Sequence, residues 1–320
     1  MNILITGATG FIGRAILADL GTDSSHRVIA LTRDTSDDLP YDIKQVRVRS
    51  IDGTTQYHGL LNDIDVIIHT AARVHQLDDT ADTAYADYNE ANVEGTLNLA
   101  RQAAESGVKR FIFLSTIKVN GESTRPEQPF TAEDTPAPGD PYAITKYTAE
   151  CGLLELSHET GIETVILRPP LVYGPGVKAN FYKLMQLAHK GYPLPFGSVE
   201  NKRSLVSIDN LVSLIRSCID HPNAANKIFL VSDDMDISTS DLVRKIAASM
   251  SLYPRLIAIP KSILMLTAAL IGKREAAKRL LGNLQVDITK TKTELDWEPV
   301  TRLDDAIRST TRDYLQRLKQ

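Results

Sequence analysis

Short runs of aliphatic and β-branched residues alternate along this chain with segments of helical periodicity, and this alternation restricts its fold more than any other feature. The runs occupy residues 2–6, 28–32, 65–70, 111–115, 164–168 and 227–231. Such alternation is typical of parallel strands joined by crossover helices. We therefore predict an α/β fold that is built on a doubly wound parallel sheet.

Two long helices are predicted beside the sheet. Apolar residues repeat at helical spacing over 93–104 until Gly107, and a second helical pattern extends from Tyr142 to Gly161. A glycine directly after a helical pattern is a common helix C-terminal signal.

The sequence pattern changes beyond residue 170, where prolines separate shorter predicted elements. We predict a first domain over 1–171 and a smaller C-terminal α/β lobe over 172–320. A segment near 205–232 is expected to return to the first domain and add a strand to its sheet.

A glycine-rich turn follows the first predicted strand. Gly7, Gly10 and Gly13 stand in "TGATGFIG", directly before a helical pattern. Glycines here allow a tight turn and let backbone N–H groups approach a pyrophosphate at the positive end of a helix. We interpret the turn as the phosphate site of a Rossmann-type domain. An ordinary glycine turn is the alternative.

The end of the second strand predicts which dinucleotide binds. An acidic residue at this place would bind the adenosine ribose, but the strand ends with Thr32, and Arg33 follows. A guanidinium group suits a 2′-phosphate, so NADP is favoured. In the alternative, Arg33 is solvated, Asp34 binds the ribose and the cofactor is NAD.

A tyrosine and a lysine stand four residues apart in "DPYAITK". Asp140 is a good N-cap and Pro141 a good first helical residue, so Tyr142 and Lys146 are predicted to share one helical face. An ammonium group nearby would lower the pKa of the phenol from about 10 and make Tyr142 an acid and base. In the alternative reading, Tyr142 is a packed core residue and Lys146 is solvated.

Hydroxyl groups at the end of the fourth run are candidates for a third catalytic group. Ser115 and Thr116 stand where strand ends line the ligand crevice of such sheets. One of them is expected to hydrogen-bond the substrate oxygen. The alternative is that both only cap a loop.

Composition excludes several other functions. The chain has 36 basic and 40 acidic side chains, a net charge of −4, so nucleic acid is not an expected partner. Two cysteines without a metal-binding pattern predict buried thiols, a reducing and therefore cytoplasmic location, and no metal site. The start of the chain shows no signal-peptide pattern.

The apolar stretch at 263–271 is too short to span a bilayer. We expect it to form a helix that packs within the second lobe. Its basic neighbours Lys261, Lys273 and Arg274 leave a role at a membrane surface as the alternative.

Several motifs together resemble the nucleotide-sugar epimerase, dehydratase and reductase family of the extended short-chain dehydrogenase/reductases. Besides the glycine turn and the Tyr/Lys pair, they are "HTAA" at 69–72, "NVEGT" at 92–96, "LRPPLVYGPG" at 167–176, "KRSLVSIDNL" at 202–211 and "ELDWEP" at 294–299. The resemblance covers essentially the whole chain, and it implies an NAD(P)-dependent enzyme acting on a UDP-linked sugar.

The resemblance also implies site residues. Thr116 takes the place of the catalytic Ser/Thr, with Ser115 beside it at the substrate. The cofactor is expected to contact Gly7, Thr9, Gly10, Phe11, Ile12, Arg33, Ile51, Ala71, Ala72, Asn92, Tyr142, Lys146 and Pro169. The nucleotide diphosphate of the sugar is expected to contact Asn180, Arg203 and, as a weaker candidate, Arg279.

Departures from the family pattern bear on the reaction. Asn120 replaces the usual tyrosine of "VYG", and Leu171 replaces a frequent asparagine. "STIKVNGE" resembles a subgroup in bacterial surface-polysaccharide synthesis that includes UDP-2-acetamido-2,6-dideoxy-hexos-4-ulose reductases. With NADPH favoured, we expect a nucleotide-sugar 4-ketoreductase, and a UDP-hexose or UDP-HexNAc 4-epimerase with retained NAD as the alternative.

Two further possibilities rank lower. Dehydratases of the family carry Asp-Glu where this chain has Ile117 and Lys118. A non-catalytic NADP(H)-sensing regulator would not need Tyr142 and Lys146. Homodimers through helices near 85–106 and 142–160 are common in the family, and the sequence leaves the oligomeric state open.

Overall fold

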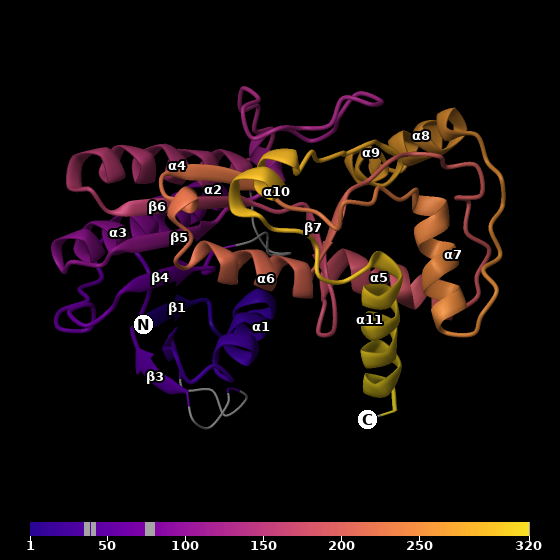
Figure 1. Cartoon of the computed structure of the whole chain (residues 1–320). Coiled ribbons are helices and arrows are strands. Elements are labelled where there is room, and N and C mark those ends of the chain that lie inside the picture. Colours follow the sequence, from indigo (N-terminus) through magenta and orange to yellow (C-terminus); the bar gives the residue numbers. More distant parts are fainter. Residues whose placement is uncertain (35–38, 40–42, 74–80, 320) are drawn as a thin grey trace.

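The computed structural model describes residues 1–34, 39, 43–73 and 81–319. Within these residues a seven-stranded parallel sheet forms the centre of the larger part of the molecule, in the order β3-β2-β1-β4-β5-β6-β9 (Figure 1). Its strands are β1 (Asn2–Thr6), β2 (Arg27–Thr32), β3 (Lys44–Arg47), β4 (Val66–His69), β5 (Arg110–Leu114), β6 (Glu163–Arg168) and β9 (Lys227–Leu230). The predicted doubly wound α/β fold is confirmed.

All six predicted strands form, each within one residue of its expected bounds. The sequence analysis missed β3, whose residues "KQVR" are half-buried or exposed. This strand lies at the edge of the sheet and pairs only with β2, so it lacks the apolar run that marks a strand covered on both faces.

Helices cover both faces of the sheet. On one face α1 (Phe11–Leu20) and α6 (Ile208–Cys218) bury apolar residues against alternate strand positions such as Ile3 and Ile5. On the other face α3 (Gly95–Glu105) and α4 (Pro141–Thr160) pack against the intervening positions, such as Leu4. α6 therefore contributes to the core beside this face of the sheet.

The strand order reverses between β1 and β4, because β2 and β3 extend the sheet on one side and β4, β5, β6 and β9 on the other. In open parallel sheets ligands bind beyond the carboxyl ends of the strands at this switch point. The turns after β1, β4 and β5 thus meet at one crevice.

The predicted helix over 93–104 is confirmed as α3, but it does not begin alone. It continues from α2 (Ala81–Asn89) through a turn of π-helix, Glu90–Glu94. Gly95 lies at the junction with no room for a side chain: a Cβ there would approach the carbonyl oxygen of Ile51 to 2.5 Å. The helix therefore presses on the loop after β3.

The C-terminal part has its own core. β7 (Leu171–Tyr173) pairs in parallel with β8 (Leu205–Ser207), and α5 (Ala179–His189), α7 (Thr239–Ser249) and α11 (Leu303–Arg317) enclose buried residues that include Tyr173 and Phe181. α10 (Thr289–Leu295) lies by β9, and the 3₁₀ turns are η2 (Ile117–Val119) and η3 (Pro222–Ala224). The domain boundary at residue 171 stays a prediction.

The apolar stretch forms the expected helix in the second lobe, whereas one of the two expected buried thiols is exposed. The apolar stretch forms α8 (Lys261–Leu270), which packs beside α9 (Arg274–Leu281), but none of the residues of α8 is buried. Cys218 is buried as expected, whereas Cys151 is exposed. Among the described residues, no helix has the length and apolar character needed to cross a bilayer.

Candidate active site

The glycine turn after β1 is a tight cradle. Gly7 has φ +68°, and a Cβ on it would lie 2.7 Å from the backbone nitrogen of Ala71, in the loop after β4. A Cβ on Gly13 would lie 2.2 Å from the carbonyl oxygen of Gly7. Gly10 is the N-cap of α1, and no side chain caps this helix end. The backbone therefore presents the positive end of α1 to the crevice, which fits a pyrophosphate group.

The remaining residues expected at this turn follow the same end of α1. Thr9 is exposed, and its carbonyl oxygen accepts a hydrogen bond from Arg14. Phe11 and Ile12 are half-buried, and Phe11 also packs against the core of the C-terminal part. This end of α1 thus lies where the two parts of the molecule meet.

The adenosine end of the crevice is rich in arginine. Arg33, Arg47 and Arg49 line an open hollow at the ends of β2 and β3, together with Asp34. Asp34 and Arg47 form an exposed ion pair of 3.7 Å. The buried hydroxyl of Thr32 has no hydrogen-bond partner among the described residues. A polar group without a partner at this strand end fits a ligand hydroxyl or phosphate.

The loop after β4 is tied to α4 through Asn92. The buried side chain of Asn92 accepts a hydrogen bond from the Arg73 nitrogen at 2.8 Å and donates to the Arg73 carbonyl oxygen at 3.1 Å and to Thr145 at 3.3 Å. Asn92 therefore holds the loop containing Ala71 and Ala72 in place. Its expected place at the nicotinamide end agrees with this link.

α4 begins and ends as its sequence predicts. Asp140 accepts a hydrogen bond from the backbone nitrogen of Ala143 at 2.8 Å, Pro141 is the first helical residue and Gly161 ends the helix at φ +79°. These signals fix the two ends of the helix, and the four-residue spacing places Tyr142 and Lys146 one turn apart within it.

Lys146 was predicted to lower the pKa of Tyr142. This prediction is wrong for the protein without a ligand, because its own groups raise that pKa. Burial, the charge of Asp140 and the neighbouring Tyr88 raise the pKa of Tyr142 to about 12. The Tyr88 and Tyr142 rings meet edge to face at 6.3 Å. The chain alone keeps this phenol protonated.

Lys146 is a buried amine and not a solvated one. Its Nζ lies 3.8 Å from the centre of the Phe113 ring on β5. Burial lowers the pKa of Lys146 to about 7, against the opposing effect of Glu150 one turn further along. The same region is close to His69 at the end of β4, where burial and then the Lys146 charge lower the pKa of His69 to about 3. The Lys146 side chain therefore extends from α4 toward the ends of β4 and β5.

The structure separates the two hydroxyl candidates. Ser115 is buried and donates a hydrogen bond to Glu150, which in turn pairs with the buried Arg168. Its hydroxyl is thus engaged with Glu150, and its expected place at the substrate stays a prediction. Thr116 is half-buried and caps the 3₁₀ turn η2 by accepting from the Lys118 nitrogen at 3.3 Å. Thr116 remains the candidate.

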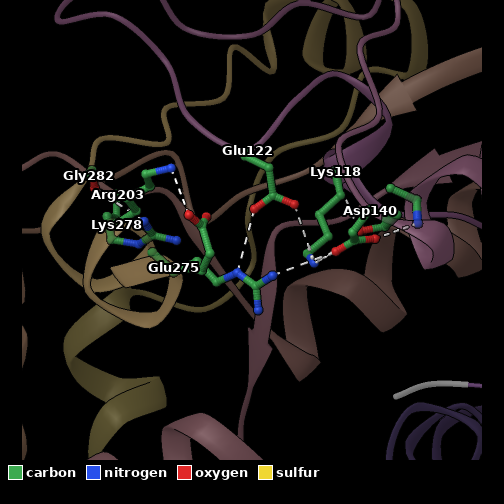
Figure 2. Close-up of polar contacts among 10 residues, drawn as sticks. Lys118, Glu122, Asp140, Arg203, Glu275, Lys278 and Gly282 are labelled. Atoms are coloured by element: carbon green, nitrogen blue, oxygen red, sulfur yellow. Dashed lines mark hydrogen bonds and ion pairs between the residues drawn. The ribbon is translucent and has the colours of Figure 1, made fainter. Parts of the chain in front are cut away.

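A cluster of charges lies beside the start of α4. Lys118 binds Asp140 and lies 3.6 Å from Glu122. Arg279 of α9 approaches the same two carboxylates, at 3.6 Å from Glu122 and 3.8 Å from Asp140. Figure 2 shows Glu122 between the Lys118–Asp140 pair and Arg203. These ion pairs join the larger and the smaller parts of the molecule.

Arg203 also belongs to this region. It donates to the carbonyl oxygen of Gly282 at 3.2 Å, its backbone pairs with Ile237, and burial lowers its pKa while Glu122 opposes that shift. Asn180 is exposed in the first turn of α5, next to Ala179 at φ +55°. The structure thus brings Arg203 near the Arg279 cluster, and within the described part of the chain no hydrogen bond or ion pair joins Asn180 to that cluster.

Two other expected cofactor residues have structural contacts. Ile51 is half-buried beside Gly95, and Pro169 is buried after β6, where its carbonyl oxygen accepts a hydrogen bond from the Ile117 nitrogen at 3.0 Å. Their roles toward a cofactor stay predictions.

Lys118 and Glu122 were not predicted to lie in this charge cluster. One signal was available: Lys118 is two residues after Thr116, and Asp140 is two residues before Tyr142. Because both segments begin at the carboxyl edge of the sheet, opposite charges in them could have been paired. Among the described residues, no group of three His, Cys, Asp or Glu is placed to hold a metal.

Comparisons with known proteins agree with this site. Residues 3–232 match the model of the NAD dependent epimerase/dehydratase family. The chain is 46% identical over 319 residues to a UDP-glucose 4-epimerase of Vibrio cholerae, covering 98% of this chain and 96% of that protein. It is 30% identical over 280 residues to a 2-alkyl-3-oxoalkanoate reductase of Stenotrophomonas maltophilia, covering 85% and 81%.

The fold has close counterparts among solved structures. A UDP-glucuronic acid 4-epimerase from Bacillus cereus in complex with NAD aligns with a TM-score of 0.80 at 22% identity, covering 100% of this chain and 98% of that one. The glycine cradle, the Tyr/Lys pair on α4 and the family match over most of its length lead to one conclusion: this chain belongs to the NAD dependent epimerase/dehydratase family of enzymes.

Proposed function

We propose that the protein is a UDP-hexose 4-epimerase that keeps a nicotinamide dinucleotide bound through its catalytic cycle. The observation that supports this proposal is the buried Lys146 of α4, one turn from Tyr142, which lies over Phe113 of β5 and acts on His69, itself bonded to Thr6 just before the glycine cradle. The 46% identity over nearly the whole length to a UDP-glucose 4-epimerase favours epimerisation over the net 4-keto reduction expected first.

The residues at the crevice suit a bound dinucleotide. The glycine cradle and the positive end of α1 fit its pyrophosphate, and the hollow beyond β2 fits its adenosine ribose. A bound nicotinamide would supply reversible hydride exchange with the sugar C4. Lys146, close to β4 and β5, is assigned to the nicotinamide ribose.

The chain's own groups manage the proton at the C4 oxygen. Tyr142 is assigned to accept and return this proton, and the Thr116 hydroxyl to hydrogen-bond the same oxygen. The Tyr142 pKa of about 12 means that the chain alone does not supply a phenolate at neutral pH. A positive charge next to the ring favours the phenolate, and a protonated Lys146 and an oxidised nicotinamide both carry one.

Arginine side chains from the smaller part of the molecule are assigned to the nucleotide diphosphate. Arg203 and Arg279 carry guanidinium groups suited to phosphate oxygens, and both lie beside Glu122. The carboxylates of Glu122 and Asp140 hold Arg279 until a diphosphate competes for it. Asn180 is assigned to the same ligand on resemblance alone.

One observation favours a second candidate, a nucleotide-sugar 4-ketoreductase that uses NADPH. Three arginines line the hollow at the adenosine end, and Arg33 and Arg49 form no ion pair among the described residues. Guanidinium groups there favour a 2′-phosphate over a plain ribose. We therefore propose that the site prefers NADP to NAD, and that Asp34 is held by Arg47.

Binding measurements decide the cofactor. Protein freed of nucleotide is titrated with NADPH and NADH by nicotinamide fluorescence, with the Arg33→Ala variant beside it and Arg14→Ala as a control at the other end of the crevice. NADPH is expected to bind at least tenfold more tightly, and Arg33→Ala to remove most of this preference. Tighter binding of NADH to the wild-type protein would contradict it.

Product analysis decides the reaction. The protein is incubated with UDP-glucose and separately with UDP-N-acetylglucosamine, and the sugars are resolved by chromatography while absorbance at the reduced-nicotinamide band is followed. An epimerase yields the C4 epimer without net change in absorbance. Stoichiometric oxidation of NADPH with a 4-keto sugar would establish the second candidate, and no turnover of either kind would leave only the cofactor-binding regulator.

Two further features remain proposals. The two cysteines are free, which is consistent with a reducing, cytoplasmic location. A homodimer through α2, α3 and α4 would cover Tyr85 and Ile144, two exposed apolar side chains on these helices. Light scattering of the wild-type protein and of Ile144→Glu measures this association.

A further inference from the structure

α8 presents an apolar face to solvent. Ile263, Leu266 and Leu270 are 49%, 63% and 79% exposed, and Ile271 directly after the helix is 68% exposed. The three helical residues are spaced i, i+3 and i+7, so they lie on one face. A contiguous exposed face of large aliphatic residues marks an interaction surface and not an ordinary exterior.

The opposite face of α8 is the one that meets the protein. Leu264, Met265 and Ala268 are half-buried, and the helix packs beside α9. The helix is therefore apolar on both sides: one side is partly covered by this chain, and the other is not. Packing against this chain explains the apolar character of Leu264, Met265 and Ala268, but not that of the exposed face.

The side chains that flank the apolar face carry positive charge only. Residues 251–274 contain Arg255, Lys261, Lys273 and Arg274 and no aspartate or glutamate, a local charge of +4 in a chain whose net charge is −4. Lys261 begins α8, and Lys273 and Arg274 follow its end. None of the four forms an ion pair within the described part of the chain, whereas most nearby cations, such as Lys278 and Arg279, do.

We propose that this α8 surface, made of Ile263, Leu266, Leu270 and Ile271 with Lys261, Lys273 and Arg274 at the two ends of the helix, binds the surface of an anionic phospholipid bilayer. The cations complement anionic headgroups, and the aliphatic side chains enter the boundary between headgroups and acyl chains. A helix of ten residues is about 15 Å long, so it lies in the interface and does not span it.

A second copy of this chain is the competing occupant, and charge disfavours it. In a twofold contact the same patch meets itself, so the three cations that adjoin α8 on one copy would face the same three on the other. Like charges opposed across an interface cost affinity. A bilayer surface with anionic headgroups satisfies the apolar face and the cations together.

The surface adjoins the active site without forming part of it. α9 follows α8 after three residues and carries Arg279, whose ion pairs reach Glu122 and Asp140 beside the start of α4. Docking of α8 would therefore set the mouth of the site near the headgroup layer, whichever reaction the site performs. The proposal does not depend on the identity of the substrate.

Vesicle co-sedimentation of the full-length protein tests the proposal. Vesicles of phosphatidylcholine with about 30% phosphatidylglycerol are compared with pure phosphatidylcholine, at low and at high salt. The wild-type protein is expected to bind the anionic vesicles at least tenfold more strongly, and binding is expected to weaken with salt because exposed charges are screened.

Two variants divide the surface into its parts. Leu266→Glu with Leu270→Glu removes the apolar contact, and Lys261→Ala with Lys273→Ala and Arg274→Ala removes most of the charge. Each is expected to lower vesicle binding at least tenfold. Val300→Glu changes a 65% exposed aliphatic residue outside this surface and is expected to bind as the wild type does. Circular dichroism and thermal unfolding check that each variant is folded.

Three results would overturn the proposal. In the first, the wild-type protein does not bind anionic vesicles. In the second, it binds neutral and anionic vesicles equally. In the third, the folded glutamate variants bind as well as the wild type does. Size-exclusion chromatography identifies the competing occupant: a wild-type dimer that Leu266→Glu/Leu270→Glu converts to a monomer, without vesicle binding, assigns the face to a second copy.

Discussion

Tyr142 is the residue on which the assigned chemistry depends most. Replacing it with phenylalanine keeps the ring beside Tyr88 and removes only the hydroxyl group. We expect kcat to fall at least about 100-fold with little change in KM, because general acid–base catalysis contributes at least that factor. Steady-state kinetics with the confirmed substrate measure it. A fall of less than about tenfold would contradict the role given to this phenol.

Asp140 both caps α4 and raises the pKa of Tyr142. An Asp140→Asn variant keeps a good N-cap but loses the negative charge, so the pKa of Tyr142 should fall. The limb of the pH–rate profile that reports the phenolate should move to lower pH by roughly one unit. Glu122→Gln is the control, because Glu122 meets the same cations but does not act on the phenol. Superimposable pH–rate profiles for wild type and Asp140→Asn would show that the Asp140 charge does not raise the pKa of Tyr142.

Lys146 makes stability depend on pH in a direction that can be worked out. Its pKa is about 7 in the folded chain and 10.5 ordinarily, so between these values the unfolded chain binds the proton that the folded chain has lost. The unfolding free energy of the protein without nucleotide should therefore rise with pH in this window, by up to about 1.4 kcal/mol per unit from this group.

Urea unfolding of wild type and Lys146→Met at pH 7, 8, 9 and 10 isolates that contribution. The difference in unfolding free energy, wild type minus variant, is expected to increase with pH. A constant or decreasing difference would mean that the amine is not as buried as the structure places it.

The turn between β1 and α1 can be tested with two glycines of nearly equal backbone geometry. Gly7 and Gly59 have φ +68° and +70°, but a Cβ meets the loop after β4 only at Gly7, and at Gly59 it meets nothing within 4 Å. Both alanine variants pay left-handed strain of about 1–2 kcal/mol. Gly7→Ala should lose roughly 1–3 kcal/mol more in unfolding free energy, and cofactor affinity as well.

Thermal unfolding and a dinucleotide titration measure the two glycine variants side by side. Gly59→Ala is expected to keep wild-type cofactor affinity. Equal losses in both variants would show that the close approach of the turn to Ala71 has no energetic weight.

The core of the larger part includes residues well beyond 171, so the chain should not divide at that residue. The face of the sheet that α1 covers is completed by Leu211 and Leu214 of α6 and by Phe229 of β9. A fragment 1–171 lacks these residues and leaves that face exposed. We expect it to bind hydrophobic dyes and lack near-ultraviolet circular dichroism, whereas fragment 1–232 should be more ordered. Cooperative unfolding of fragment 1–171 would show that the first domain is autonomous.

Local patterns account for what the sequence determined by itself. The strands, the glycine turn and the limits of α4 follow from runs of apolar residues, from positions that tolerate only glycine and from the Asp140 cap. These preferences act over a few residues, so they can be seen without knowing which distant segments meet. The edge strand β3 was not predicted, because its residues form only a short, mostly polar pattern.

Tertiary structure decided the features that arise from contacts between distant residues. Burial beside Asp140 and Tyr88 reversed the expected shift of the Tyr142 pKa, and the Ser115 hydroxyl bonds to the buried Glu150, whereas Thr116 caps the turn η2. The placement of α8 with its apolar face outward likewise depends on which side α9 covers. Desolvation and charge pairing act through space, and the order of residues along the chain does not specify those neighbours.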